Sequence, residues 1–82
     1  MSGRLIFSKD IVEKFAIPYS TVTLYTNMGF FVVVERKGNR RMYDENDVKA
    51  QLEKITKLIN DGYPLRLIRK VLLNGENSNG LL

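Results

Sequence analysis

The sequence predicts a mainly α-helical domain that carries one small β-hairpin. Helical periodicity recurs in four short segments, which are separated at Pro18, at Gly29 and at the Gly62 to Pro64 stretch. Between the second and third segments, a β-branched run passes into Lys-Gly-Asn and out again, which is a hairpin pattern. The predicted order is helix, turn, helix, two-stranded wing and two helices, which is a winged helix-turn-helix.

The first two helices are predicted from capping residues and from Pro18. Ser8 is expected to cap a helix that ends near Ala16, with Asp10 in its first turn and Phe7 stapled onto Val12. Pro18 suits the first turn of a second helix, so the two helices are separated by only a few residues. The second helix is predicted over residues 18–28. Its apolar edge contains Val22, Tyr25 and Met28, and its polar edge contains Tyr19, Ser20, Thr23 and Asn27.

The hairpin is expected over residues 32–43. Gly29 suits the left-handed position that ends the second helix, and residues 30–34 then read as a mostly buried strand. The return strand is predicted over residues 40–43. The basic side chains at the tip and flanks of this wing are Arg36, Lys37, Arg40 and Arg41.

The third helix is expected to begin at Asp44, with Asp47 three residues on. Tyr43 and Val48 occupy the positions of a hydrophobic staple, and Gly62 ends the helix with Tyr63 folded back toward Leu58. Its predicted buried face contains Val48, Leu52, Ile55 and Ile59.

The fourth helix is predicted over residues 64–73, opening at Pro64. Leu65, Ile68 and Leu72 are expected to face inward, and Arg66, Arg69 and Lys70 to face outward. The domain is expected to cover residues 1–75, followed by a flexible polar tail at residues 76–82.

Composition narrows the function. The 82 residues suffice for one domain, and the net charge of +4 favours an anionic partner. The chain has Cys 0 and His 0, which excludes disulfides, thiolate nucleophiles, imidazole bases and the usual zinc sites. No recognisable catalytic arrangement remains, so we expect a protein that is not an enzyme and has no cofactor.

The acids at positions 44, 45 and 47 lack the glycine and terminal glutamate of a calcium loop and are explained by helix capping. Without a signal peptide or an apolar span, a cytoplasmic, nucleoid-associated protein is expected.

A basic hairpin beside a polar-faced helix is typical of a domain that binds double-stranded DNA. The helix is expected in the major groove and the wing on the flanking backbone. Two other interpretations remain open: charged hairpin edges also prevent aggregation, and a polar helix face is often only solvated. Tyr25 and Tyr43 are expected in the core rather than on DNA.

Several spaced motifs resemble the DNA-binding domain of the MerR (mercury-resistance regulator) family of bacterial transcription factors. The likeness covers roughly Ile6 to Leu73. The motifs are Thr-Val-Thr-Leu-Tyr at 21–25 and Met-Gly-Phe at 28–30 in and after the second helix, Asn-Arg-Arg-Met-Tyr at 39–43 in the wing, and Gly-Tyr-Pro-Leu at 62–65 with Ile68 and Leu72 in the fourth helix. The resemblance implies a bacterial transcriptional regulator and places Arg41 at the wing arginine that contacts phosphate.

The chain departs from the family pattern in two places. Thr23 stands where the family commonly has a DNA-contacting arginine, and Leu24 stands where it has a tyrosine, so the family's operator sequence does not carry over. The sequence also ends near the point where the family's dimerisation helix and effector domain begin, and the family's metal-binding cysteines are absent. An excised domain and a minimal relative without a sensor are both compatible with this.

Two alternative functions stay open beside transcriptional regulation. A DNA-architecture factor of the excisionase type, from a phage or plasmid, uses a similar small winged fold. More remotely, the basic amphipathic helix 64–73 suits a protein groove or a membrane surface, although no membrane partner is expected. We expect a monomer free in solution that becomes paired or tandem on DNA.

Overall fold

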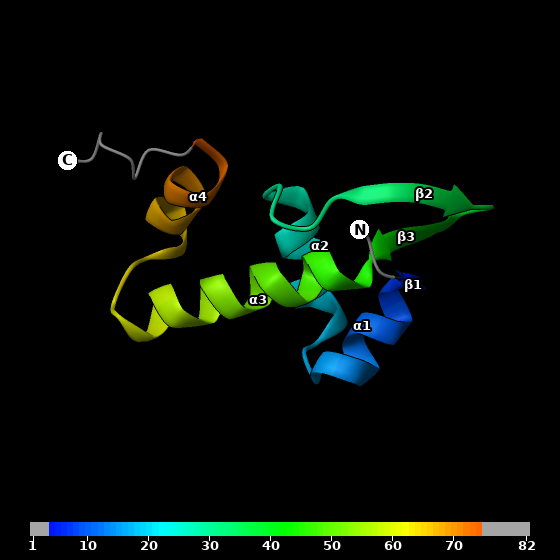
Figure 1. The fold of residues 1–82 in the computed structure, drawn as a ribbon, viewed down its shortest axis with the longest axis horizontal. Coiled ribbons are helices and arrows are strands. Elements are labelled where there is room, and N and C mark those ends of the chain that lie inside the picture. Colours follow the sequence, from blue (N-terminus) through cyan, green and yellow to red (C-terminus); the bar gives the residue numbers. More distant parts are fainter. Residues whose placement is uncertain (1–3, 75–82) are drawn as a thin grey trace.

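A computed structural model describes residues 4–74 of the chain. The elements follow the order β1 (Leu5–Phe7), α1 (Ser8–Phe15), α2 (Tyr19–Asn27), β2 (Val33–Lys37), β3 (Arg40–Asp44), α3 (Glu45–Asn60) and α4 (Leu65–Asn74). In Figure 1, α3 runs along the long axis, the hairpin of β2 and β3 projects beyond one end of it, and α4 stands near the other end. The predicted winged helix-turn-helix is therefore confirmed. The tail predicted at residues 76–82 lies outside the described residues.

The sheet has three strands, not the two that were predicted. β1 pairs antiparallel with β3 in the order β1-β3-β2, and Ile6 lies opposite Tyr43. The Glu45 amide continues this pairing by donating to the Arg4 carbonyl at 3.0 Å. A three-residue strand carries almost no periodic pattern of its own, and its partner is distant in sequence, so local reasoning missed it.

The first helix begins one residue earlier than a Ser8 cap implies. Phe7 occupies the N-cap position with an extended backbone, and Ser8 is already helical. The side chain that caps this end belongs to Asp10, inside the helix: its carboxylate accepts a hydrogen bond from the Phe7 amide at 2.9 Å. The predicted end is confirmed: Ala16 adopts a left-handed conformation with φ 55°.

The strand predicted at residues 30–34 is wrong in its first half. Phe30 and Phe31 are buried but lie in the turn after α2, and the strand starts only at Val33. Gly29, at φ 91°, reverses the chain, and the amides of Phe30 and Phe31 then donate to the Tyr25 carbonyl. Their backbone groups thus close the helix and are not available to the sheet.

Aromatic rings fill the centre of the core. The Tyr25 ring makes edge-to-face contacts with Phe30 and Phe31, each at 5.6 Å between centroids, and Phe31 continues to Tyr43 at 6.2 Å. Tyr25 and Tyr43 are therefore core residues, as predicted. The buried apolar side chains are Ile6, Ile11, Val22, Tyr25, Phe30, Phe31, Tyr43, Val48, Ile55 and Ile68.

The start of α3 confirms the predicted cap. The Asp44 carboxylate accepts hydrogen bonds from the amides of Asn46 at 2.9 Å and Asp47 at 3.1 Å. Val48 and Ile55 are buried, but Ile59 is 44% exposed, so its predicted burial is wrong. The last turns of α3, which include Ile59, extend past α1 and α2 (Figure 1).

The fourth helix is amphipathic as predicted. Ile68 is fully buried, while Arg66, Arg69 and Lys70 are exposed. Arg69 ties this helix to the end of α2, because its Nε donates to the Met28 carbonyl at 2.9 Å. The end of α2 is therefore held by a side chain from α4.

Candidate nucleic-acid interface

The backbone of the helix-turn-helix turn sets the start of α2. Pro18 has the fixed φ of −66°, and its carbonyl accepts hydrogen bonds from the amides of Thr21 at 3.0 Å and Val22 at 3.2 Å. Proline has no amide hydrogen, so Pro18 itself adds no orphaned donor at the start of the helix. Val22 and Tyr25 anchor the buried side, and Tyr19 is left 62% exposed on the other.

A hollow of about 590 Å³ lies between α2, the wing and the start of α1. It brings together five of the eight predicted DNA-binding residues from two separate elements: Tyr19 and Thr23 from α2, and Arg36, Arg40 and Arg41 from the wing. An uncharged polar helix edge and three guanidinium groups thus line one concave surface. We call this surface the basic hollow.

The other three predicted residues lie outside the basic hollow. Ser20 and Asn27 are exposed on α2, and Lys37 is exposed beside the hairpin turn at Gly38, which has φ 65°. Exposure leaves all three available to a ligand that is larger than the hollow. A DNA duplex, whose major groove alone is about 12 Å wide, is such a ligand.

Sequence reasoning missed four residues of the basic hollow, namely Phe7, Ser8, Lys9 and Asn39. The first three were interpreted only as the start of a helix, and they reach the hollow because β1 adds a third strand beside the wing. Asn39 was interpreted as a turn residue. Lys9, a cation next to the predicted cap, was the one of the four whose charge could have indicated a contact with an anionic ligand.

Like charges face each other across the wing. The register of β2 and β3 places Arg36 opposite Arg41 and Lys37 opposite Arg40. Two cross-strand pairs of like charge destabilise a hairpin unless an anion lies beside them. The ion pairs found within residues 4–74 involve Glu45 and Asp61, so none of them neutralises the wing.

The Arg40 guanidinium lies over an aromatic ring. Its Cζ is 3.8 Å from the centroid of the Phe7 ring, which is a cation–π contact between the wing and the end of β1. This contact keeps the positive charge of Arg40 at the rim of the basic hollow, because both residues line it.

A pair of hydroxyl groups joins α2 to β3. Thr26 Oγ1 donates to the Val22 carbonyl at 2.7 Å and lies 2.9 Å from the Tyr43 hydroxyl. Because the single hydroxyl hydrogen of Thr26 is used on Val22, Tyr43 is the donor in the second bond. Burial raises the pKa of the neighbouring Tyr25 above its usual value, so that phenol stays neutral at physiological pH.

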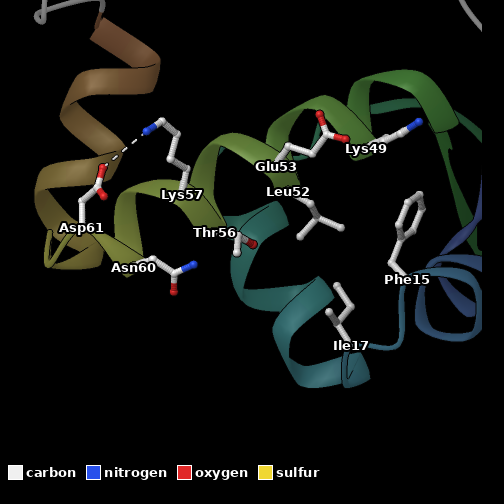
Figure 2. A pocket seen from close by; sticks show the side chains of 9 residues that line it. All are labelled: Phe15, Ile17, Lys49, Leu52, Glu53, Thr56, Lys57, Asn60 and Asp61. Atoms are coloured by element: carbon white, nitrogen blue, oxygen red, sulfur yellow. Dashed lines mark ion pairs between the residues drawn. The ribbon is translucent and has the colours of Figure 1, made fainter.

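A second hollow, of about 640 Å³, lies away from the wing, between α3 and the α1–α2 connection. Figure 2 shows Phe15 and Ile17 pointing toward α3, Leu52 projecting from α3 into the same space, and charged side chains along the rim. One rim contact is the ion pair of Lys57 and Asp61, 3.7 Å between Nζ and Oδ2. Within residues 4–74 no cluster of three or more potential metal ligands is present. The hollow therefore has an apolar floor and a charged rim.

Comparison with known protein families gives a match over most of the chain. A family model described as MerR HTH family regulatory protein matches residues 8–74, which is most of the chain. Searches of curated proteins and of solved structures gave no significant match. None of the helices in the described part of the chain has both the length and the apolar character needed to cross a membrane.

Proposed function

Because the chain belongs to the MerR family of helix-turn-helix regulatory proteins, which bind DNA and regulate transcription, we propose that it binds double-stranded DNA sequence-specifically, with α2 in the major groove and the wing on the flanking backbone. The observation that carries this proposal is the basic hollow. It joins the uncharged reading edge of α2 to the unneutralised cations of the wing.

The dimensions of α2 suit the major groove. An α-helix with its side chains is about 10–12 Å across, and nine residues span about 13.5 Å. The major groove is about 12 Å wide, so one short helix enters it end-on or along its floor. Tyr19 and Asn27 are exposed and Thr23 is half-buried; spaced four residues apart, they form one edge of α2 that we place toward the bases.

The wing supplies the contact to phosphate. Phosphate oxygens placed between the opposed cations of β2 and β3 convert repulsion into attraction, which is the arrangement that the cross-strand register favours. These contacts carry no sequence information by themselves; they set the register in which α2 meets the bases. Affinity thus comes mainly from the wing and discrimination mainly from α2.

Selection of bound duplexes from a random pool tests the proposal. The expected product is a short half-site that binds specifically and competes against scrambled duplex. A spaced inverted repeat would indicate a paired regulator, and tandem direct sites would indicate the architectural alternative. Recovery of no enriched sequence, with no binding of any duplex at low salt, would refute the proposal.

A further inference from the structure

Leu24 is an apolar side chain on the exposed side of α2. It is 44% exposed, whereas its helical neighbours Val22 and Tyr25 are buried. At about 100° per residue, Leu24 lies on the same arc as Ser20, one turn before it, and Asn27, three residues after it. The leucine therefore belongs to the side of the helix that carries the predicted reading residues, and not to the core.

The recognition helix carries no charged residue. Residues 19–27 read Tyr-Ser-Thr-Val-Thr-Leu-Tyr-Thr-Asn, without lysine, arginine, aspartate or glutamate. The commonest specific contact to DNA, a bidentate arginine or lysine on guanine, is thus not available to this helix. The groups that remain on its exposed side are hydroxyls, the Asn27 amide and the methyl groups of Leu24.

These remaining groups have their matching partners on A·T pairs. An asparagine amide forms two hydrogen bonds with adenine N6 and N7, and apolar side chains contact the 5-methyl group of thymine. Leu24 and Asn27 are three residues apart on a helix, so their side chains meet neighbouring positions in the groove. An aliphatic group beside an amide therefore suits consecutive A·T pairs.

We propose that Leu24 is a specificity-determining residue that reads the 5-methyl group of thymine in the major groove. The proposal rests on the proposed function and names the chemistry that α2 recognises. The wing holds the duplex, and Leu24 removes one thymine methyl from water when the helix is seated. The methyl contact distinguishes A·T from G·C at one position of the half-site.

Replacing thymine by uracil tests the proposal directly, because it deletes the methyl group and preserves base pairing and all hydrogen-bonding groups in the groove. Each thymine of a selected half-site is replaced in turn, and affinity is measured by fluorescence anisotropy. The expected result is a loss of about fourfold at one position, the change that burial of one methyl-sized group gives at about 0.8 kcal/mol. Leu24→Ala should bind the thymine duplex more weakly and lose the difference between thymine and uracil.

Leu67→Ala is the matched control. Leu67 is a leucine of similar exposure, 40% against 44%, on α4. This variant should retain the full thymine preference and bind both duplexes as the unaltered chain does.

Two outcomes would overturn the inference while leaving the proposed function intact. Either uracil substitution has no effect at any position although the duplex binds in a salt-dependent manner, or Leu24→Ala keeps the same thymine preference. If Leu24→Ala instead changed only the sedimentation of the free protein, Leu24 would be a contact between copies and the inference would be wrong. Failure of every duplex to bind would refute the proposed function itself.

Discussion

Arg40 and Phe7 are thirty-three residues apart in sequence, yet the guanidinium of one lies 3.8 Å from the ring centroid of the other. The contact exists because β1 pairs with β3, which places Phe7 opposite Met42 and near the base of the wing. An arginine on a hairpin normally loses conformational entropy when it binds phosphate. Here the ring holds the cation in place before any ligand arrives.

Replacing Phe7 by leucine should weaken DNA binding without unfolding the protein. The substitution keeps an apolar side chain and removes the ring face, so Arg40 loses a contact of about 0.5–1 kcal/mol at an exposed site. We expect affinity for selected and scrambled duplexes to fall alike by about two- to fivefold, the change that this free energy gives. Anisotropy titrations on both duplexes measure it.

Phe15→Leu is the control, because Phe15 lines the second hollow, beside α3, and not the basic hollow. Its DNA affinity should be unchanged. An increase in affinity on Phe7→Leu would contradict the account, since it would mean that Arg40 must leave the ring before it can reach phosphate.

Replacing Tyr43 by phenylalanine should destabilise the fold. The change removes the hydroxyl that donates to Thr26 Oγ1 and keeps the buried ring. The expected loss is about 1 kcal/mol in the free energy of unfolding, or about 4–8 °C in Tm for a domain of this size. Thermal unfolding followed by circular dichroism measures it, and Tyr63→Phe, at a 41% exposed tyrosine, should leave the Tm unchanged. Equal Tm values for both variants would show that the hydroxyl pair contributes nothing.

Arg41→Ala and Thr23→Ala should separate affinity from discrimination. Arg41 is assigned to phosphate, so its loss should weaken all duplexes about equally and reduce the salt slope by about one. Thr23 is assigned to base edges, so its loss should lower the ratio of affinities between a selected and a scrambled site. Titrations of both variants on both sites provide the comparison.

Thr56→Ala serves as the control, because this exposed threonine of α3 lines the second hollow and not the basic hollow. It should change neither quantity. The assignment fails if Arg41→Ala alters sequence preference while the circular dichroism spectrum remains that of the unaltered chain.

The 82-residue chain should be a monomer in dilute solution and pair only on DNA. Leu52, Leu65 and Leu72 are partly buried against the core, and Ile68 is fully buried, so these side chains are used within one copy. Ile59 and Leu67 are exposed but do not form a heptad seam. Sedimentation at micromolar concentration, repeated with one and with two half-sites per duplex, tests this; a tight dimer without DNA would contradict it.

The local features of the fold were predictable from sequence. Pro18, Gly29, Asp44 and Gly62 act through their own backbone or through hydrogen bonds two to four residues away, so the helix limits they imply lie close to those observed. The same holds for the wing turn at Gly38. Interactions of this range leave a signature in a short window of sequence.

The features that sequence reasoning missed depend on distant partners. β1 exists only because β3 lies beside it. Phe30 and Phe31 are buried as predicted, but their amides close α2 instead of joining the sheet, so β2 starts only at Val33. Exposure of Ile59 likewise depends on where the neighbouring helices end. Phe7 and Lys9 reach the basic hollow because β1 lies beside β3. Because β1 was not predicted, these two residues were not predicted for the site either.

The dependence of DNA affinity on salt tests the central claim most directly. Each phosphate neutralised by the wing releases counterions, so log affinity against log salt should be linear with a slope of about −0.9 per contact. With the four cations of the wing, Arg36, Lys37, Arg40 and Arg41, we expect a slope of about −4, which is a loss of about two orders of magnitude between roughly 50 and 200 mM salt. Anisotropy titrations of one duplex over this range provide the slope, and a flat titration would contradict the account.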